Sequence, residues 1–227
     1  TGMSEDLGKL RDAIDLIDRE VLAALARRMQ LSDKVIAAKG GVAAFRPGRE
    51  AQLVHQLVAI CRGSGLDLAP AVVLGIWRQI MAASLGRQNG GLTCAVHPDA
   101  LAAAVWHMGA MVEMSHAADL TTLLGRLADG SCRYVLVPAT GDLAALAAVL
   151  AAHNGLYVMA RTPLFDMPAI PPAFIIATYL PDPSGDDISL FLSETATATL
   201  DIVAVDGYHD AAPDNMVGAR LVGIYAR

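Results

Sequence analysis

The sequence predicts an all-helical domain over residues 3–90, followed by a small α/β domain over residues 92–227. The first stretch lacks Pro and carries apolar residues at helical spacing, whereas the part beyond Gly90-Gly91 alternates short apolar, β-branched runs with helical stretches. A chain of 227 residues is long enough to build two hydrophobic cores. Thr1 and Gly2, ahead of Met3, are interpreted as residues added for expression.

The first helix is expected from Ser4 to Lys39, where Gly occurs only at Gly8. Its apolar residues alternate at spacings of mainly three and four, at Leu7, Leu10, Ile14, Ile17, Val21, Ala24, Leu31, Val35 and Ala38. This pattern resembles the seam of a coiled coil, which has to pack against another helix.

Two further helices complete the predicted N-terminal domain. One is opened by Pro47 and runs to about Arg62, before Gly63-Ser64-Gly65. The next is expected from Asp67, as N-cap, to Asn89.

Beyond residue 91 the sequence predicts strands at 93–96, 111–114, 133–137, 156–159, 174–179, 188–192, 202–205 and 221–225. Helical stretches near 99–108, 119–128 and 142–152 separate the earlier strands. Such alternation predicts a largely parallel sheet.

Three cations on the first helix point to anion binding. Arg28 falls on the apolar seam, so its charge needs a partner of opposite charge within the interface. Lys39 lies about 20° around the helix and roughly 16 Å along it from Arg28, so both can reach one small ligand. Arg11 lies roughly 25 Å from Arg28 and about 100° around the axis, too far to share that ligand within one chain. We therefore expect Arg11 to serve a site in a second copy, in an antiparallel homodimer.

The runs LRDAIDLIDREVLAALARRMQLSDKVIAAK, RPGREAQLV and IWRQIMAASLGRQ resemble the all-helical chorismate mutase family, especially the mutase domain of bifunctional mutase/prephenate dehydratase enzymes. The resemblance covers residues 7–90. The family's charged and polar positions recur in order as Arg11, Arg28, Lys39, Arg49, Glu50, Ser84 and Gln88. It implies an intertwined helical dimer.

The resemblance also implies the chemistry, in which chorismate, a small dianion, rearranges to prephenate without a cofactor or a metal. Such an enzyme holds the substrate in a reactive geometry and stabilises charge on its ether oxygen. By resemblance, Arg28 and the second chain's Arg11 bind the carboxylates, and Lys39 and Gln88 approach the ether oxygen. Lys39 also lies near a carboxylate. Glu50 binds the ring hydroxyl, Ser84 lies near a carboxylate, and Arg49 supports the site.

Two departures from these patterns stand out. The mutase family often has Asp four residues before the matching Glu, where this chain has Arg46. Residues 118–165 resemble the first lobe of prephenate dehydratase, but that family's Thr-Arg pair is here Pro172-Ala173. We therefore expect a degenerate dehydratase-like domain, and an unrelated α/β domain is the alternative.

Other interpretations stay open. Arg11 could be an ordinary solvated side chain, Lys39 could complement a helix C-terminus, and Arg49 and Glu50 could be ordinary first-turn residues. Ser84 and Gln88, four residues apart, could be an exposed pair. Isochorismate pyruvate-lyases share the fold and similar cations, and a non-catalytic anion-sensing regulator could also keep the pocket.

The composition of the chain limits which partners, metals and compartments are expected. A net charge of −6 argues against nucleic acid, and the apolar stretches are too short or too interrupted to span a membrane. The three cysteines are odd in number, without metal spacing, and are expected to be reduced. The six histidines form no metal-binding motif. No signal-peptide pattern opens the chain, so we expect a cytoplasmic protein.

Overall fold

The computed structural model describes residues 2–38, 45–88, 92–109, 112–141, 143–194 and 199–227, apart from the side chains of residues 2–5, 36, 87 and 88. The chain divides into two compact units, residues 1–44 and residues 45–227, which are described separately. The first unit holds a single helix, and the second holds two helices together with an α/β region. The predicted boundary between a helical domain of residues 3–90 and an α/β domain of residues 92–227 remains a prediction.

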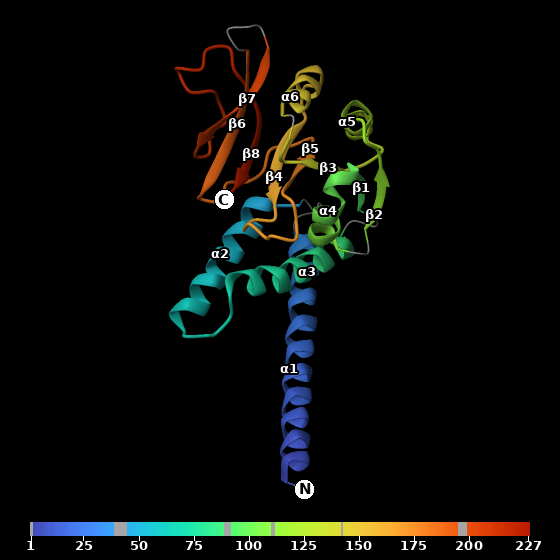
Figure 1. Ribbon diagram of the computed structural model, residues 1–227, viewed down its shortest axis with the longest axis vertical. Coiled ribbons are helices and arrows are strands. Elements are labelled where there is room, and N and C mark those ends of the chain that lie inside the picture. The colour runs from blue at the N-terminus through green and yellow to red at the C-terminus, as the bar shows by residue number, and fades with distance from the viewer. Residues whose placement is uncertain (1, 39–44, 89–91, 110–111, 142, 195–198) are drawn as a thin grey trace. The chain divides into compact units, whose positions relative to one another are not determined.

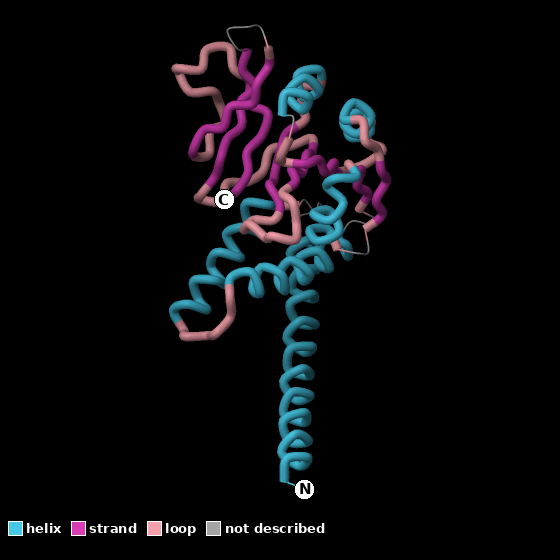
Figure 2. Tube along the Cα trace, viewed as in Figure 1, coloured by secondary structure: helices cyan, strands magenta, loops and turns pink. Residues whose placement is uncertain are grey.

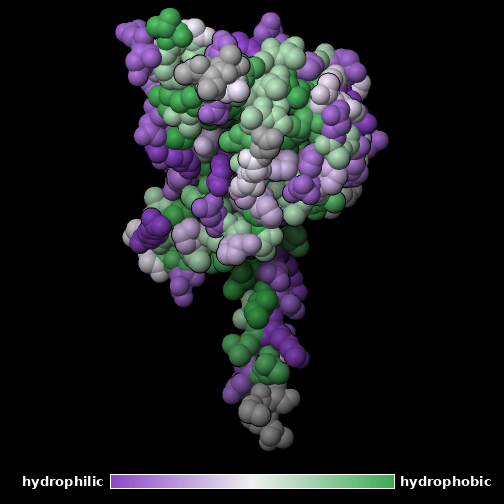
Figure 3. Space-filling view, turned by 45° about the horizontal axis from the view of Figure 1, so that its top comes forward, coloured by the Kyte–Doolittle hydropathy of each residue, from purple (hydrophilic) through white to green (hydrophobic). Residues whose placement is uncertain are grey.

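Helix α1 (Gly2–Ala38) confirms the expected first helix, while Lys39 lies outside the described residues. Its seam side chains are about half exposed, from 49% at Leu7 to 61% at Leu10. Figure 3 shows apolar and charged residues gathered on different sides of this helix. An apolar stripe of this length is costly in water, so α1 presents a surface suited to a partner.

Helices α2 (Pro47–Gly63) and α3 (Pro70–Gln88) confirm the other two expected helices. The expected start of the third helix at Asp67 is wrong, because the helix begins at Pro70. Proline is favoured in a first turn, and it keeps the residue before it out of the helical region.

The α/β region contains the 3-10 helix η1 (Pro98–Ala100) and helices α4 (Leu101–Met108), α5 (Leu120–Ala128) and α6 (Leu143–Ala152). Its strands are β1 (Thr93–Val96), β2 (Glu113–His116), β3 (Tyr134–Pro138), β4 (Tyr157–Thr162), β5 (Ala173–Ala177), β6 (Asp187–Glu194), β7 (Leu200–Asp206) and β8 (Arg220–Ala226). They form one sheet in the order β2-β1-β3-β5-β4-β8-β6-β7 (Figures 1 and 2).

The expectation of a largely parallel sheet is wrong. Within the described residues β1 pairs in parallel with β2 and β3, and β4 pairs in parallel with β8. The pairs β3/β5, β4/β5, β6/β7 and β6/β8 are antiparallel. The reason is that helices separate only the first strands, and later strands follow one another through loops that allow antiparallel pairing.

The sheet separates two layers of packed side chains. Val135 and Val137 of β3 pack with α5 and α6, whereas the alternate residues Tyr134 and Leu136 pack with α4. Phe45, which precedes α2, and Leu85, which lies in the last turns of α3, pack in the layer with α4. A third cluster joins Val54 of α2 and Leu74 of α3 to Trp106 and Leu164, so α2 and α3 share a core with the α/β region.

Helix α2 is fastened to the loop before β6. The carboxylate of Asp182 accepts hydrogen bonds from the Arg49 backbone N–H and from Arg46 Nη2, each at 3.1 Å. A Cβ at Gly48 would collide with the Asp182 carbonyl, so only glycine allows this approach. Further along the helix, Gln52 donates to the Pro183 carbonyl at 3.1 Å. The N-terminal turn of α2 is thus fixed by residues far away along the chain.

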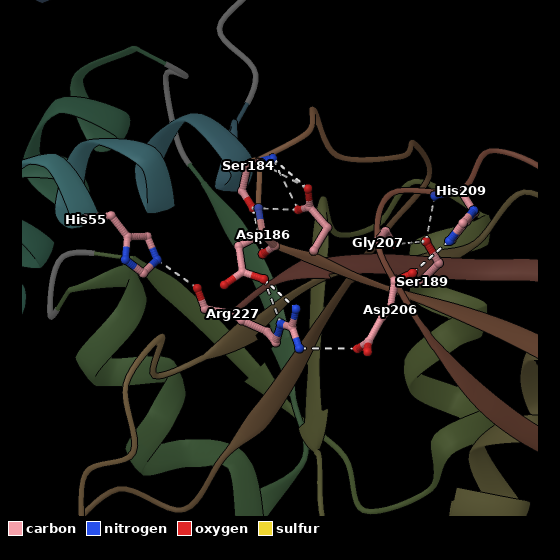
Figure 4. A network of polar contacts seen from close by, with 10 residues as sticks. His55, Ser184, Asp186, Ser189, Asp206, Gly207, His209 and Arg227 are labelled. Atoms are coloured by element: carbon pink, nitrogen blue, oxygen red, sulfur yellow. Dashed lines mark hydrogen bonds and ion pairs between the residues drawn. The ribbon is translucent and has the colours of Figure 1, made fainter.

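A polar network holds the end of β8 beside β6 and β7 (Figure 4). Arg227 forms ion pairs with Asp186 at 2.6 Å and with Asp206 at 3.2 Å. Its carbonyl oxygen lies 2.7 Å from Nε2 of His55, which comes from α2. This network gives α2 a second attachment to the sheet.

Candidate functional site

Glu50 and Arg78 form a largely buried ion pair between α2 and α3. Glu50 stands in the first turn of α2, which Pro47 opens, and Arg78 stands in the middle of α3. A nitrogen of Arg78, Nη1, donates to Oε2 of Glu50, and only 4% and 18% of the two side chains are exposed. A predicted site residue is therefore held by an arginine whose role the sequence did not predict.

This ion pair lies at the wall of a cavity of about 40 Å³ between the two helices and the α/β region. The cavity is lined by Pro47, Glu50, Ala51, Val54, Leu74, Arg78, Met81, Trp106, His107, Ala160, Arg161, Leu164 and Ala226. Most of these side chains are apolar, with a few polar groups among them, and the volume is enough for a water molecule beside the polar groups.

His107 of α4 is the third buried polar group at this cavity. Its Nδ1 lies 2.8 Å from Oγ1 of Thr162, the last residue of β4. Burial, with a smaller contribution from the positive charge of Arg78, holds the pKa of His107 well below its usual range. His107 is therefore neutral at physiological pH.

Three buried nitrogens at this cavity have no hydrogen-bond partner among the described residues. They are Nε and Nη2 of Arg78 and Nε2 of His107. Buried polar groups in folded proteins are nearly always paired, so each of these atoms calls for a partner such as a water molecule or a ligand.

Ser84 is buried on α3, and its hydroxyl donates to the Ile80 carbonyl one turn earlier, at 2.9 Å. Among the described residues it does not line the cavity beside Glu50. Arg49, next to Glu50, has an exposed side chain at the start of α2. Arg46, at the position where the resemblance leads us to expect Asp, pairs with Asp182.

The cations of α1 lie in the other unit. Arg11 is exposed and Arg28 is half-buried. Because α1 is one continuous helix from Gly2 to Ala38, the two positions are separated by roughly 25 Å along its axis. Lys39 and the side chain of Gln88 lie outside the described part of the chain. The seven predicted site residues therefore remain a prediction as a group.

A second and larger cavity, of about 790 Å³, lies at the carboxyl ends of β1 and β3. Among the described residues, those of its lining that titrate are His97, Asp99 and Asp119. Hydrogen bonds from the Thr122 hydroxyl and backbone N–H lower the pKa of Asp119, which caps α5. Since its pKa is lowered, Asp119 stays ionised and is not suited to donate a proton to a bound ligand.

Arg78 could have been found from the sequence by the reasoning applied to Arg28. It lies four residues after Leu74 and three before Met81, so it stands on the apolar face of α3. His107 gives no such signal, because an isolated histidine at the end of an apolar helix has many ordinary roles.

The described part of the chain offers neither a metal cluster nor a membrane-spanning helix. No group of three or more His, Cys, Asp or Glu side chains there could hold a metal ion. None of the helices described is both long enough and apolar enough to cross a bilayer. The three cysteines are buried and unpaired in this structure.

Comparison with known proteins gives a family match for the N-terminal part of the chain. Residues 10–89 match the family described as chorismate mutase type II. This matched region contains α2, α3 and most of α1.

Among solved structures, one described as "GqqA- a novel type of quorum quenching acylases" is 12% identical, with a TM-score of 0.42. The match covers 60% of this chain and 95% of that one. No curated protein matches the sequence.

Proposed function

We propose that this protein is a chorismate mutase that converts chorismate to prephenate. The proposal is carried by the match of residues 10–89 to the chorismate mutase type II family, with the family's charged and polar positions present in order. That match supports mutase activity in general, and the assignments below go further.

The rearrangement breaks a C–O bond while a C–C bond forms within one molecule, so it needs neither a nucleophile nor a proton transfer. Catalysis then depends on holding both arms of the dianion in a near-attack geometry and on stabilising charge at the ether oxygen. Arg28 and Arg11 of the partner subunit suit the two carboxylates, because a guanidinium can bind a carboxylate through two parallel hydrogen bonds.

The remaining roles follow the resemblance. Lys39 and Gln88 donate to the ether oxygen, Glu50 accepts from the ring hydroxyl, and Ser84 approaches a carboxylate. Arg49 supports the site and is not one of its principal catalytic residues. The buried ion pair between Arg78 and Glu50 suits this assignment, since it restrains the carboxylate that would hold the substrate hydroxyl.

The homodimer belongs to the same proposal. The half-exposed apolar stripe of α1 is what a helix presents when its natural partner is a second copy. An antiparallel arrangement would bring Arg11 of the partner subunit to a site built around Arg28.

For residues 92–227 we propose a degenerate dehydratase-like domain in a cytoplasmic enzyme. Two observations support the loss of dehydratase chemistry. Pro172 and Ala173 stand where prephenate dehydratases have Thr-Arg. Asp119, in the large cavity, accepts a hydrogen bond from the Thr122 backbone N–H and so caps α5. Prephenate should therefore not be dehydrated.

Turnover of chorismate and of isochorismate by the purified full chain tests the proposal. We expect prephenate from chorismate. Conversion of isochorismate alone would indicate a pyruvate-lyase, and binding without turnover of either compound would indicate a regulator.

Replacing Arg28 by Ala should lower the rate about a thousandfold, equivalent to roughly 4 kcal/mol of transition-state stabilisation. Arg27→Ala, at the exposed neighbouring position on α1, is the matched control and should stay near wild type. An Arg28→Ala enzyme within tenfold of wild type would remove Arg28 from the site.

A further inference from the structure

We propose that the loop before β6 is a working part of the mutase site, because Asp182 and Pro183 fix the position of α2 and so direct the carboxylate of Glu50. The inference rests on the proposed function, in which Glu50 accepts a hydrogen bond from the ring hydroxyl of chorismate. Asp182 and Pro183 are positioning residues that act through Glu50. All three belong to the unit of residues 45–227.

The contacts that hold α2 lie along one side of the helix. Gly48, Gln52 and His55 follow one another at spacings of four and three, which places them on one face. Gly48 meets the backbone of Asp182, and Gln52 donates to the carbonyl of Pro183. Nε2 of His55 lies 2.7 Å from a carbonyl oxygen just after β8 (Figure 4). Contacts spread over nearly two turns fix the rotation of the helix about its axis.

Glu50 lies on the other side of α2. At 100° per residue it stands about 160° around the axis from both Gly48 and Gln52. Its carboxylate accepts from Arg78 of α3, and 18% of its side chain is exposed. A helical turn moves as a rigid body, so the contacts on one side decide where the carboxylate on the other side points.

A small rotation of α2 would be enough to disturb the proposed site. Side chains reach roughly 6 Å from a helix axis, so a turn of about 20° would move the Glu50 carboxylate by roughly 2 Å. A displacement of about 1 Å can lower a catalysed rate about a hundredfold. The hydroxyl contact therefore requires α2 to be held accurately.

The loop approaches α2 more closely than a side chain would allow. A Cβ on Gly48 would lie 2.8 Å from the carbonyl carbon of Asp182 and nearer still to its oxygen. Backbone atoms cannot swing aside as the end of a flexible side chain can, so alanine at this position has to push the helix and the loop apart. The Asp182 carboxylate also accepts from the Arg49 backbone N–H at 3.1 Å, in the turn that carries Glu50.

Kinetics can separate positioning from stability. Partial unfolding removes whole sites, which lowers the apparent kcat and leaves the KM of the remaining sites unchanged. A misdirected Glu50 carboxylate weakens the hold on the substrate hydroxyl, so the KM for chorismate rises.

Gly48→Ala in the full chain is the direct test. It keeps every charge and favours the helix itself, but it separates α2 from the loop. Gly63→Ala, at the other end of the same helix, is the matched control, because a Cβ there meets no described atom within 4 Å. We expect the KM for chorismate to rise at least tenfold in Gly48→Ala and to stay within twofold of wild type in Gly63→Ala. An unchanged KM in Gly48→Ala would overturn the proposal.

A second pair of variants covers the case in which Gly48→Ala fails to fold. Asp182→Ala removes an acceptor from the first turn of α2, and Asp119→Ala removes the corresponding acceptor from α5. Both changes take a carboxylate from a helix start, but only Asp182→Ala should raise the KM, at least threefold. Equal KM values in these two variants would also overturn the positioning role.

Turnover by the unsubstituted protein distinguishes this inference from the mutase assignment. If the wild-type chain does not convert chorismate, the proposed function fails and the positioning role fails with it. If the wild-type chain converts chorismate and the variants keep its KM, the positioning role alone is wrong.

Discussion

The pair of Arg78 and Glu50 shows how a single buried charge depends on its partner. Arg78→Met would leave the carboxylate of Glu50 largely buried without its cation, whereas Glu50→Gln/Arg78→Met removes both charges. We expect the single change to lower the free energy of unfolding by about 3 kcal/mol, and the double change to lower it less. Urea denaturation of the variants measures both values. A loss in the double variant equal to or larger than that of Arg78→Met would contradict the coupling.

The pKa of the Cys94 thiol, in β1, shows the effect of burial on a single side chain. Burial, with a smaller contribution from Cys132, raises the pKa of Cys94 from 9.0 to about 12. In the unfolded chain the thiol ionises near pH 9, so its stabilising contribution is present below pH 9 and is lost as the pH rises toward 12.

Reaction with a disulfide reagent checks this pKa. At about pH 8.5 the thiol of Cys94 should react slowly in the native protein and rapidly in denaturant, because only the thiolate is nucleophilic. Cys94→Ala identifies its share of the reaction. Rapid modification of Cys94 in native protein would show that the thiol is accessible and ionised.

At the scale of elements, α2 depends on an acid from a distant loop. Asp182 accepts from the first-turn backbone of α2 and pairs with Arg46. Asp182→Ala should destabilise the protein by about 1–2 kcal/mol, as loss of a helix cap does, with only a small part due to the partly exposed ion pair.

Thermal or urea denaturation measures this loss, and Asp214→Ala is a suitable control. Asp214 is exposed, and its substitution should change the free energy of unfolding by no more than about 0.5 kcal/mol. Equal effects of the two changes would show that the contact of Asp182 with α2 contributes little.

At the scale of the whole molecule, α1 decides the proposed assembly. Arg11 and Arg28 lie roughly 25 Å apart on one helix, so each complete site should need Arg28 from one chain and Arg11 from the other. Arg11→Ala and Arg28→Ala proteins should each be inactive, and a mixed dimer would contain one intact site.

Mixing equal amounts of these two proteins, with free exchange of subunits, should restore roughly a quarter of wild-type activity. About half of the dimers are then mixed, and each has one good site of two. No recovery despite measured exchange would place both arginines in one chain's site.

Local signals in the sequence were sufficient for the elements. Pro47 and Gly63 bound α2, and the strands and helices beyond residue 91 lie within a few residues of their predicted ranges. Hydrophobic periodicity and chain-breaking residues act over short distances, so the sequence displays them directly. The third helix shows the limit, because Pro70 outweighed a suitable N-cap at Asp67.

The candidate site was predictable only in part. The seven predicted residues follow from their order along the chain, and the family match at residues 10–89 supports that set without testing each role. The contact between Glu50 and Arg78 joins positions 28 residues apart, and no pattern specified which cation would face the carboxylate.

The sequence by itself determined the helices, the strands and the family that residues 10–89 match, because these depend on local patterns and on the identity of residues in order. Tertiary structure decided the mixed sheet, the docking of α2 on Asp182 and the burial of Arg78 beside His107. These features depend on contacts between distant segments, whose energies become defined only when the chain packs.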